Sequence, residues 1–337
     1  MSKKILTISI AAYNVSETID ECLSHFLNCR HLDDLEILVV NDGSTDDTVE
    51  KVKKYTSKYP DSIILVNKEN GGWGSTLNKG IEVATGKYFR QLDGDDYYDE
   101  KNLDALVEYL KNCDTDIVAT PFCHFADDTG AITKYFENDQ NYETGEVINI
   151  IETDLYPPAM HSINVKTSIL KKNKINITEH CFYTDVEFVI KSLNNSKTIS
   201  FFGLPVYYYR LGRDGQSMSI SGVRKHYKDH QKMLLGMYDY VYNHSSSEEM
   251  KKILLRRLIE ATMYQYKFYM ALKTNSQHRK ELAEFDAKLK EVAPECYDLN
   301  YGAPVRLFRK NNFRFYKPIS AIKNYQDKKH EAFLYEK

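Results

Sequence analysis

The first 125 residues alternate between short apolar runs and longer segments with apolar residues every three or four positions. Apolar runs of four to eight residues favour buried strands, and the longer spacing favours amphipathic helices. The predicted strands are 4–13, 35–42, 62–68 and 87–93, and the predicted helices are 16–28, 44–59, 75–86 and 100–112. This alternation predicts a doubly wound, mostly parallel α/β sheet. Ligands of such sheets bind at the carboxyl ends of the strands.

The pattern changes twice further along the chain. The run 116–126 predicts a strand, and Asp127-Asp128-Thr129-Gly130 after it predicts the turn of a hairpin. Residues 146–215 are mixed, with a predicted helix at 183–195 and short strands at 198–203 and 206–212. After residue 222 nearly every segment has helical spacing. We therefore expect an α/β domain over 1–220 and a helical region over 221–337 that ends in a basic, aromatic tail.

Composition narrows the class of protein. The formal charge of −3 gives no reason to expect a nucleic-acid partner. No apolar run approaches the roughly 18 residues that a membrane-spanning helix needs. The first residues lack a small-x-small cleavage site, which favours a strand over a signal peptide. The six cysteines form no C-x-x-C pair, as expected of reduced thiols in a cytosolic protein.

Polar, glycine-rich and acidic residues follow each predicted strand. Tyr13 and Asn14 follow the first, 41–44 the second, 67–80 the third and 92–96 the fourth. Because the carboxyl ends of parallel strands share one edge, these groups should converge on a ligand crevice. In isolation, the stretch 41–44 is more typical of a simple turn between a strand and a helix.

Three aspartates crowd the end of the fourth strand: Asp93, Asp95 and Asp96. Like charges this close need a cation to offset their repulsion. A calcium loop of the EF-hand type is excluded, because its sixth position would be Tyr98 instead of glycine and its twelfth Asp104 instead of glutamate. Carboxylates two positions apart suit Mg²⁺ or Mn²⁺, which complete their shells with substrate phosphates. The cluster therefore predicts a divalent cation carried with a diphosphate.

The glycine-rich stretch 70–75 has two familiar explanations, and neither fits. No G-K-[ST] follows, so it is not a phosphate-binding P-loop, and its glycines are misplaced for a dinucleotide fingerprint. Its glycines still allow close approach of the backbone to a phosphate or sugar. Trp73 within it is equally compatible with a stacking lid and with a packed core residue.

Taken together, these motifs resemble the family 2 glycosyltransferases of the GT-A fold. The resemblance rests on A-Y-N at 12–14, N-D-G-S-T-D-D-T at 41–48, the glycine-rich stretch from 70 to 88 and L-D-G-D-D at 92–96, and it covers roughly residues 5–220. It implies a catalytic domain over 1–220 and an inverting transferase that uses a nucleotide-diphosphate sugar, expected to be a UDP-sugar, with Mn²⁺ or Mg²⁺. It further implies a hexosyl or N-acetylhexosaminyl transferase that builds cell-envelope or capsular polysaccharide on a glycan or lipid-linked acceptor.

The resemblance also implies residue roles. Tyr13 would stack on the base and Asp42 would hydrogen-bond it, whereas Asp95 and Asp93 would serve the metal, diphosphate and sugar as the D-x-D element. The residues expected to bind the donor are Tyr13, Asn14, Asp42, Asn70, Gly71, Asn78, Asp93, Gly94, Asp96, Arg210 and Ser217. Of these, Arg210 and Ser217 would engage the diphosphate, with Arg213 and Gln216 near. The histidine usual in that late loop is missing here, so closure over the diphosphate should differ in detail.

The general base implied by the family is an acidic residue at the start of a later helix. Here Asp185 fills that position, Thr184 stands where the family has glutamate, and Glu187 is the weaker candidate. A purely structural alternative is that Asp185 complements the helix dipole.

Other classes of protein remain open at this point. A glycosidase also uses two carboxylates, but it has no need of a metal-diphosphate motif. A sugar-phosphate nucleotidylyltransferase shares a similar sheet, but its N-terminal glycine-rich, arginine-bearing signature is absent. A non-catalytic nucleotide-sugar-binding module would have lost its base, whereas Asp185 is present.

The tail after residue 300 mixes arginine and lysine with phenylalanine, tyrosine and leucine. This mixture fits contact with an anionic membrane, which would place a cytoplasmic protein peripherally at the inner face of the cell membrane. It fits equally a segment packed on the catalytic domain or a contact in a homo-oligomer.

Overall fold

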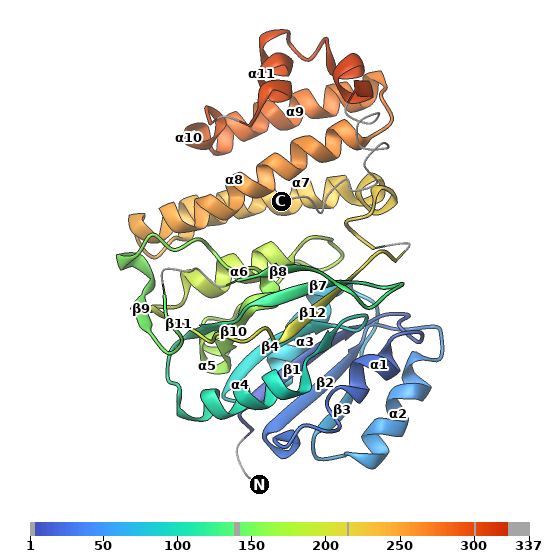
Figure 1. Ribbon diagram of the computed structural model, residues 1–337. Helices are drawn as coiled ribbons and strands as arrows, with labels where there is room; N and C mark the ends of the chain where they lie inside the picture. Colours follow the sequence, from blue (N-terminus) through green and yellow to red (C-terminus); the bar gives the residue numbers. More distant parts are fainter. Residues whose placement is uncertain (1–3, 138–141, 214–215, 300, 323–337) are drawn as a thin grey trace. The chain divides into compact units, whose positions relative to one another are not determined.

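The computed structural model describes residues 4–137, 142–213, 216–299 and 301–322. The chain divides into two compact units, Met1–Arg213 and Asp214–Lys337 (Figure 1).

An eight-stranded sheet forms the centre of the first unit, with the order β3-β2-β1-β4-β10-β6-β11-β9. The four strands β3, β2, β1 and β4 are parallel, whereas β10 is antiparallel to both of its neighbours. The bounds are β1 (Leu6–Ala12), β2 (Leu35–Asn41), β3 (Ile63–Asn67), β4 (Tyr88–Asp93), β6 (Ile117–Ala119), β9 (Val147–Asn149), β10 (Ile163–Lys166) and β11 (Thr198–Phe201). The predicted mostly parallel α/β sheet is confirmed.

A second, four-stranded sheet has the order β5-β12-β7-β8. Its strands are β5 (Tyr97–Tyr98), β7 (Phe122–Ala126), β8 (Ile132–Phe136) and β12 (Tyr207–Leu211). The predicted hairpin is confirmed, because β7 and β8 are antiparallel on either side of the turn. The single strand predicted over 116–126 is wrong: it breaks at Thr120-Pro121, and its halves, β6 and β7, belong to different sheets. Proline supplies no backbone N–H for a ladder, which suits it to such a break.

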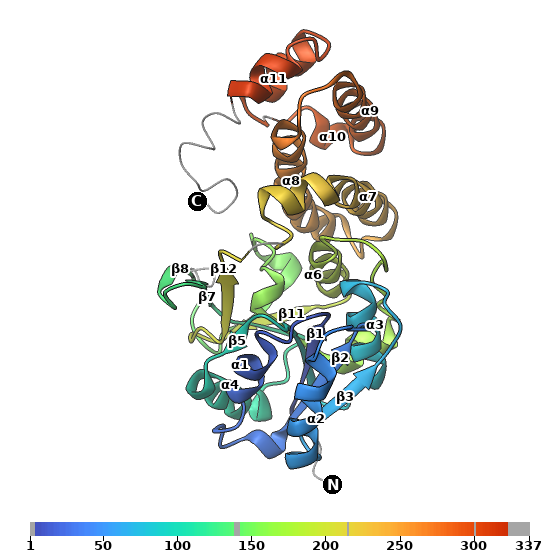
Figure 2. The same cartoon turned by 90° about the vertical axis from the view of Figure 1, so that its right-hand side faces the viewer.

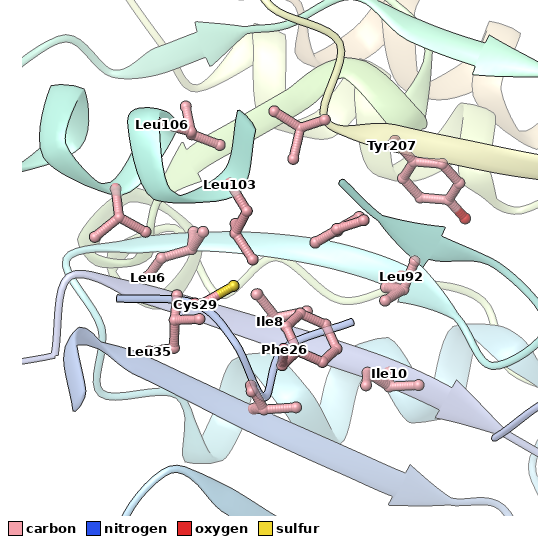
Figure 3. Close-up of a cluster of buried hydrophobic side chains, with 14 of the residues drawn as sticks. Leu6, Ile8, Ile10, Phe26, Cys29, Leu35, Leu92, Leu103, Leu106 and Tyr207 are labelled. Atoms are coloured by element: carbon pink, nitrogen blue, oxygen red, sulfur yellow. The ribbon is translucent and has the colours of Figure 1, made fainter. Parts of the chain in front are cut away.

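Helices cover both faces of the large sheet (Figure 2). They are α1 (Ile19–Ser24), α2 (Thr48–Lys58), α3 (Trp73–Val83), α4 (Glu100–Asn112), α5 (Thr167–Lys172) and α6 (Asp185–Asn194). Alternate residues of β1, Leu6, Ile8 and Ile10, pack with side chains of α1 and α4 in one hydrophobic cluster (Figure 3). On the opposite face, the ring of Phe89 in β4 meets that of Phe188 in α6, 6.3 Å between centroids. Both faces of the central strands are therefore buried, as in other parallel sheets.

A fully buried arginine joins the two sheets. The guanidinium of Arg90 in β4 donates to Tyr98 Oη in β5 (3.1 Å), Asn164 Oδ1 in β10 (3.2 Å), Thr120 Oγ1 (3.1 Å) and the carbonyl of His161 (2.6 Å). Within the described residues it forms no ion pair with a carboxylate. Its charge is offset by neutral acceptors alone, and burial lowers its pKa.

The second unit is helical. It contains α7 (Ile220–His244), α8 (Glu248–Ala271), α9 (Ser276–Val292), α10 (Pro294–Tyr297) and α11 (Ala303–Lys310). Its core includes a buried carboxylate, Asp286, which accepts from Tyr266 Oη (2.5 Å), Tyr297 Oη (2.9 Å) and Arg309 Nε (2.9 Å). Three donors on three elements meet this one carboxylate, which fixes α8, α10 and α11 against α9. In the part of the chain that the structure describes, no helix is both long and apolar enough to cross a membrane.

The Arg90 contacts generate a prediction about stability. We expect Arg90→Met to lower the free energy of unfolding of the first unit by about 2–4 kcal/mol, because several buried acceptors lose their donor. Lys54→Met on the exposed side of α2 is the control. Urea unfolding, followed by a probe in the first unit, measures both. A change as small as that of the control would show that Arg90 does not join the sheets.

Candidate active site

The carboxyl ends of the four parallel strands are level with one another. Ala12 of β1 is opposite Asn41 of β2, Asn41 is opposite Asn67 of β3, and Ala11 is opposite Asp93 of β4. The loops after these strands therefore start at one edge of the sheet. This confirms the convergence that the sequence predicted.

The carboxylate of Asp42 organises the loop after β3. It accepts from the backbone N–H of Gly71 (2.9 Å) and of Gly72 (2.8 Å) and from Lys68 Nζ (2.7 Å). The Asn70 amide in turn donates to the Asp42 carbonyl (3.0 Å). The Asp42 side chain is only 3% exposed. In this structure the Asp42 carboxylate holds residues 68–72, and its contact with a base stays a prediction.

The ring of Tyr13 is 51% exposed at this same edge. Asn14 next to it adopts a φ of +52° and accepts a hydrogen bond from Thr45 N (2.8 Å). The side-chain amide of Asn78 is hydrogen-bonded to the loop before α6. Its Oδ1 accepts from Ile177 N (2.7 Å), and its Nδ2 donates to Ile177 O (2.9 Å). Among these residues, Tyr13 has the surface that is free to meet a flat ring.

The three aspartates after β4 differ in their partners. Asp93 Oδ1 accepts from the indole N–H of Trp73 (2.7 Å). Asp96 is buried, and both of its oxygens are used by β12: Tyr207 Oη donates to Oδ2 (2.5 Å) and Arg210 N donates to Oδ1 (2.7 Å). Gly94 is required between them, because a Cβ there would lie 2.9 Å from the Ala11 carbonyl. These contacts give Asp96 a structural task, and the donor contact predicted for it stays a prediction.

Burial and mutual repulsion hold these carboxyl groups toward their neutral forms. The pKa of Asp93 is raised to about 7, first by burial, then by the charge of Asp95 and more weakly by that of Asp185. The pKa of Asp95 is raised by burial, which the charges of Arg213 and Arg210 partly oppose. Burial raises the pKa of Asp96 well above its usual range, and its two neighbours add to the effect.

Arg210 lies under the D-G-D-D turn. Its guanidinium donates to the Asp95 carbonyl (2.6 Å), to Asp127 Oδ1 (2.7 Å) and to Glu21 Oε2 (2.5 Å), and the side chain is only 6% exposed. In this structure the Arg210 guanidinium is bonded to protein partners, and its contact with a diphosphate stays a prediction. Arg213 is more exposed and forms an ion pair with Glu17. Ser217, also predicted to bind the donor, belongs to the second unit and is not placed relative to this site.

Asp185 is the first residue of α6, directly after a strained turn. Tyr183 and His180 adopt φ values of +65° and +50°, which bulky residues seldom adopt. His180 N donates to the Gly71 carbonyl (2.6 Å), and a Cβ on Gly74 would lie 2.3 Å from the Thr178 carbonyl. The turn is thus locked onto the glycine-rich loop, and Asp185 comes within electrostatic reach of Asp93.

Glu187, the weaker candidate base, is buried and committed to structure. It pairs with Lys191 (2.6 Å) and accepts from Thr178 N (3.2 Å). Asp185 is the other acidic residue in the first turn of α6.

Asp93 and Asp95 fit a divalent cation, but only as two protein ligands. The described residues include no group of three or more histidine, cysteine or acidic side chains that could hold a metal. The repulsion that raises the pKa of Asp93 is the kind that a bound cation relieves. A two-carboxylate set suits Mg²⁺ or Mn²⁺ that completes its shell with phosphate oxygens.

The sequence did not indicate three residues that hold the site together. Lys68 pairs with Asp42, Tyr207 holds both Asp96 and the backbone N–H of Asp93, and Glu21 pairs with Arg210. For Trp73, the structure favours neither of the two expected roles, because its indole N–H fixes Asp93. Lone residues of these types carry no spacing signal, since their partners are distant in sequence.

Comparison with known proteins shows what this chain is similar to. Residues 7–168 match the model of glycosyl transferase family 2. The chain is 28% identical over 221 residues to a poly(ribitol-phosphate) beta-glucosyltransferase of Bacillus spizizenii, over 65% of this chain and 34% of that protein. It is 26% identical over 299 residues to the minor teichoic acid biosynthesis protein GgaB of Bacillus subtilis, over 85% of this chain and 32% of that protein. The chain thus spans about a third of the length of these two relatives.

Solved structures agree on the fold. Residues 1–349 of TarS from S. aureus superpose with a TM-score of 0.65 at 19% identity, covering 87% of this chain and 82% of that one. The same protein in complex with UDP-GlcNAc gives 0.63 at 21% identity. A mannosyltransferase from Pyrobaculum calidifontis, in complex with GDP-Man and Mn²⁺, gives 0.52 at 16% identity. The match to glycosyl transferase family 2 covers residues 7–168, just under half of the chain, and the fold is the GT-A fold, as the sequence motifs predicted.

The raised pKa of Asp93 generates a prediction for the metal-free protein. In the unfolded chain this carboxyl ionises near pH 4, but in the folded protein it does so only near pH 7. Folding is therefore penalised progressively as the pH rises from about 4 to about 7. Asp93→Asn removes the charge and keeps an acceptor for Trp73. We expect it to stabilise the first unit by about 1–3 kcal/mol at about pH 8 and to have little effect at about pH 4.

Urea unfolding in the presence of a chelator measures this difference. Asp61→Asn, a change at an exposed aspartate, is the matched control. Equal stability of Asp93→Asn and the unaltered protein at the higher pH would contradict the crowding of charge inferred here.

Proposed function

We propose that this chain is an inverting glycosyltransferase that moves a sugar from a UDP-sugar to an acceptor hydroxyl during synthesis of a cell-envelope polymer. The observation that carries the proposal is the grouping of Asp93, Asp95 and Asp185 at one sheet edge, with the exposed ring of Tyr13 at the same edge. A nucleotide-diphosphate sugar needs a surface for its base, a cationic environment for its diphosphate and a base for its acceptor. This edge of the sheet has residues that could meet each of these three needs.

The donor would lie along the carboxyl ends of the strands. Tyr13 has the exposed ring on which the base would stack. The loop at 70–72, held by Asp42, would present backbone to the ribose or the diphosphate. Support for uracil comes from TarS, which is similar in fold and was solved with UDP-GlcNAc and with UDP. The mannosyltransferase with GDP-Man shows that this fold also accepts another base.

A divalent cation, Mn²⁺ or Mg²⁺, would be held by Asp95 and Asp93. When bound, such an ion offsets charge on the departing nucleoside diphosphate. Arg213 is the arginine proposed to assist there, because its charge already acts on Asp95 and its side chain is partly exposed. Arg210 keeps the turn in place from below through the Asp95 carbonyl. It is a positioning residue in this scheme.

Asp185 is the proposed general base. It would take the proton of the acceptor hydroxyl while that oxygen forms a bond to C1 of the sugar. The bond from C1 to the diphosphate oxygen breaks at the same time, and the nucleoside diphosphate leaves with the electron pair. Attack from the face opposite the leaving group inverts the anomeric centre. Asp185 is the first residue of α6, at the positive end of the helix dipole.

The acceptor is proposed to be a hydroxyl of a polyol-phosphate or glycan chain, and the transferred unit a hexose or N-acetylhexosamine. Support comes from the names of relatives, which include a poly(ribitol-phosphate) beta-glucosyltransferase and a teichoic acid biosynthesis protein. The reaction would take place in the cytoplasm, where nucleotide sugars are made.

Two other functions are compatible with a nucleotide-sugar fold. A nucleotidylyltransferase would form the donor from a sugar phosphate, and a binding module would hold it without turnover. Both leave Asp185 without a task, although the turn before it is strained and locked in place. We therefore favour the transferase.

The base assignment has a direct test. We expect Asp185→Asn to lower kcat for transfer or for donor hydrolysis by about 10²–10⁴-fold and to leave UDP binding nearly unchanged, since only the proton acceptor is lost. Glu187→Gln is the instructive comparison, because it should act on stability through its ion pair with Lys191. Turnover by Asp185→Asn equal to that of the parent would refute the assignment.

Metal use is tested with the same donor assay. We expect hydrolysis of a UDP-sugar to need Mn²⁺ or Mg²⁺, to stop with a chelator, and to be lost in Asp95→Asn. A screen of UDP-, GDP- and dTDP-sugars would identify the donor at the same time. Full activity in the presence of chelator would show that the two aspartates act without a metal.

A further inference from the structure

The segment 303–322 of the second unit has both exposed cations and exposed apolar side chains. The charges are those of Arg306, Lys310, Arg314 and Lys317, all exposed. The apolar side chains are Leu307, Phe315 and Ile322, which are 45%, 48% and 60% exposed. We call this set the basic-apolar face. No acidic residue occurs between positions 303 and 322.

The face follows from the helical spacing of α11. Val305 and Phe308 are buried, whereas Arg306, Leu307 and Lys310 are exposed. Positions 306, 307 and 310 are neighbours on a helix surface, so a leucine lies between two cations on the outer side. The same order recurs after the turn, where Phe313 and Tyr316 are buried and the residues between them are not.

A fifth cation of the same segment behaves differently. Arg309 points into the unit, where its guanidinium pairs with Asp286 (2.9 Å) and lies 3.7 Å from the centre of the Tyr297 ring. The four cations of the basic-apolar face form no ion pair with any residue that the structure describes. The segment therefore separates one structural charge from four that are available to a partner.

The chemistry of the face selects the kind of partner. A soluble polyanion would need the cations but would gain nothing from exposed leucine, phenylalanine and isoleucine. Another protein core would need the apolar residues but would have to desolvate four charges. An anionic lipid surface satisfies both, because apolar side chains enter the acyl boundary while lysine and arginine meet the phosphate groups.

We infer that the basic-apolar face docks the second unit onto an anionic lipid bilayer. The chain would lie on the membrane without crossing it, and a weak apolar insertion and a weak charge attraction would act together. The inference rests on α11 and the residues after it. It is therefore independent of the proposed transferase activity.

Flotation with vesicles tests this docking. We expect the full chain to bind vesicles of equal parts phosphatidylglycerol and phosphatidylcholine, and to bind phosphatidylcholine vesicles far less. Changing Arg306, Lys310, Arg314 and Lys317 to glutamine should weaken binding by at least about 100-fold, since each basic residue contributes roughly fivefold. Changing Leu307 and Phe315 to glutamine should weaken it by at least about tenfold. Added salt should weaken binding by the unaltered protein.

A matched variant controls for net charge. It changes Lys225, Lys252, Lys273 and Arg279 to glutamine, four exposed cations of the same unit outside the basic-apolar face. We expect it to bind as the parent does. All the substituted side chains are exposed, so circular dichroism and elution volume should not change.

Four results would overturn the inference. The first is equal binding to both kinds of vesicle, and the second is an equal loss of binding in the matched variant. The third is complete competition by soluble polyphosphate together with unchanged binding by the leucine and phenylalanine variant, which would make the face a polyanion site. The fourth is a smaller assembly for that variant on gel filtration, which would make the face a contact between copies of the chain.

Discussion

The site depends on the attachment of Asp96 to β12. Tyr207 Oη and the backbone N–H of Arg210 occupy both oxygens of this buried carboxylate, and the Arg210 guanidinium returns to the Asp95 carbonyl. These contacts tie the end of β4 in the large sheet to the small sheet. They hold the intervening turn against the end of β1, where the residue between Asp93 and Asp95 must be glycine. Two carboxylates are thereby kept at the sheet edge despite their repulsion.

Several buried carboxylates in this chain have a structural task. Asp42, Asp96, Glu187 and Asp286 are buried with donors around them, and each fixes a loop or a helix. Asp93 and Asp95 are crowded beside Asp96, and burial raises the pKa of all three. A fold tolerates the burial and mutual repulsion of carboxylates where a bound ligand offsets their charge. The proposed cation and diphosphate are that ligand.

Much of the fold followed from hydrophobic periodicity. The parallel strands, their helices and the hairpin at 127–130 have strong local signals, and residues 1–137 contain most of them. The inserted strand β10 was missed because it has only four residues and pairs with strands distant in sequence. The predicted helix 16–28 is shorter in the structure, where α1 ends at Ser24 and turns follow. Tertiary contacts override local spacing at such places.

The site was predictable in outline and less so in its roles. The sequence motifs located the D-G-D-D turn, the glycine-rich loop and Asp185, because these have fixed spacing or a fixed place beside a helix. Sequence alone could not show that the polar side-chain atoms of Asp42 and Arg210 form hydrogen bonds with other residues of the protein. Hydrogen-bond partners far apart in the chain leave no pattern in either segment. The availability of a charged group is therefore a property that only the folded structure reveals.

A crystal structure of the protein with Mn²⁺ and UDP would test the central claim most directly. The account predicts anomalous scattering from manganese beside the carboxylate of Asp95, with the uracil ring against Tyr13 and the diphosphate between them. Manganese bound away from the D-G-D-D turn, or UDP bound at another edge of the sheet, would contradict it.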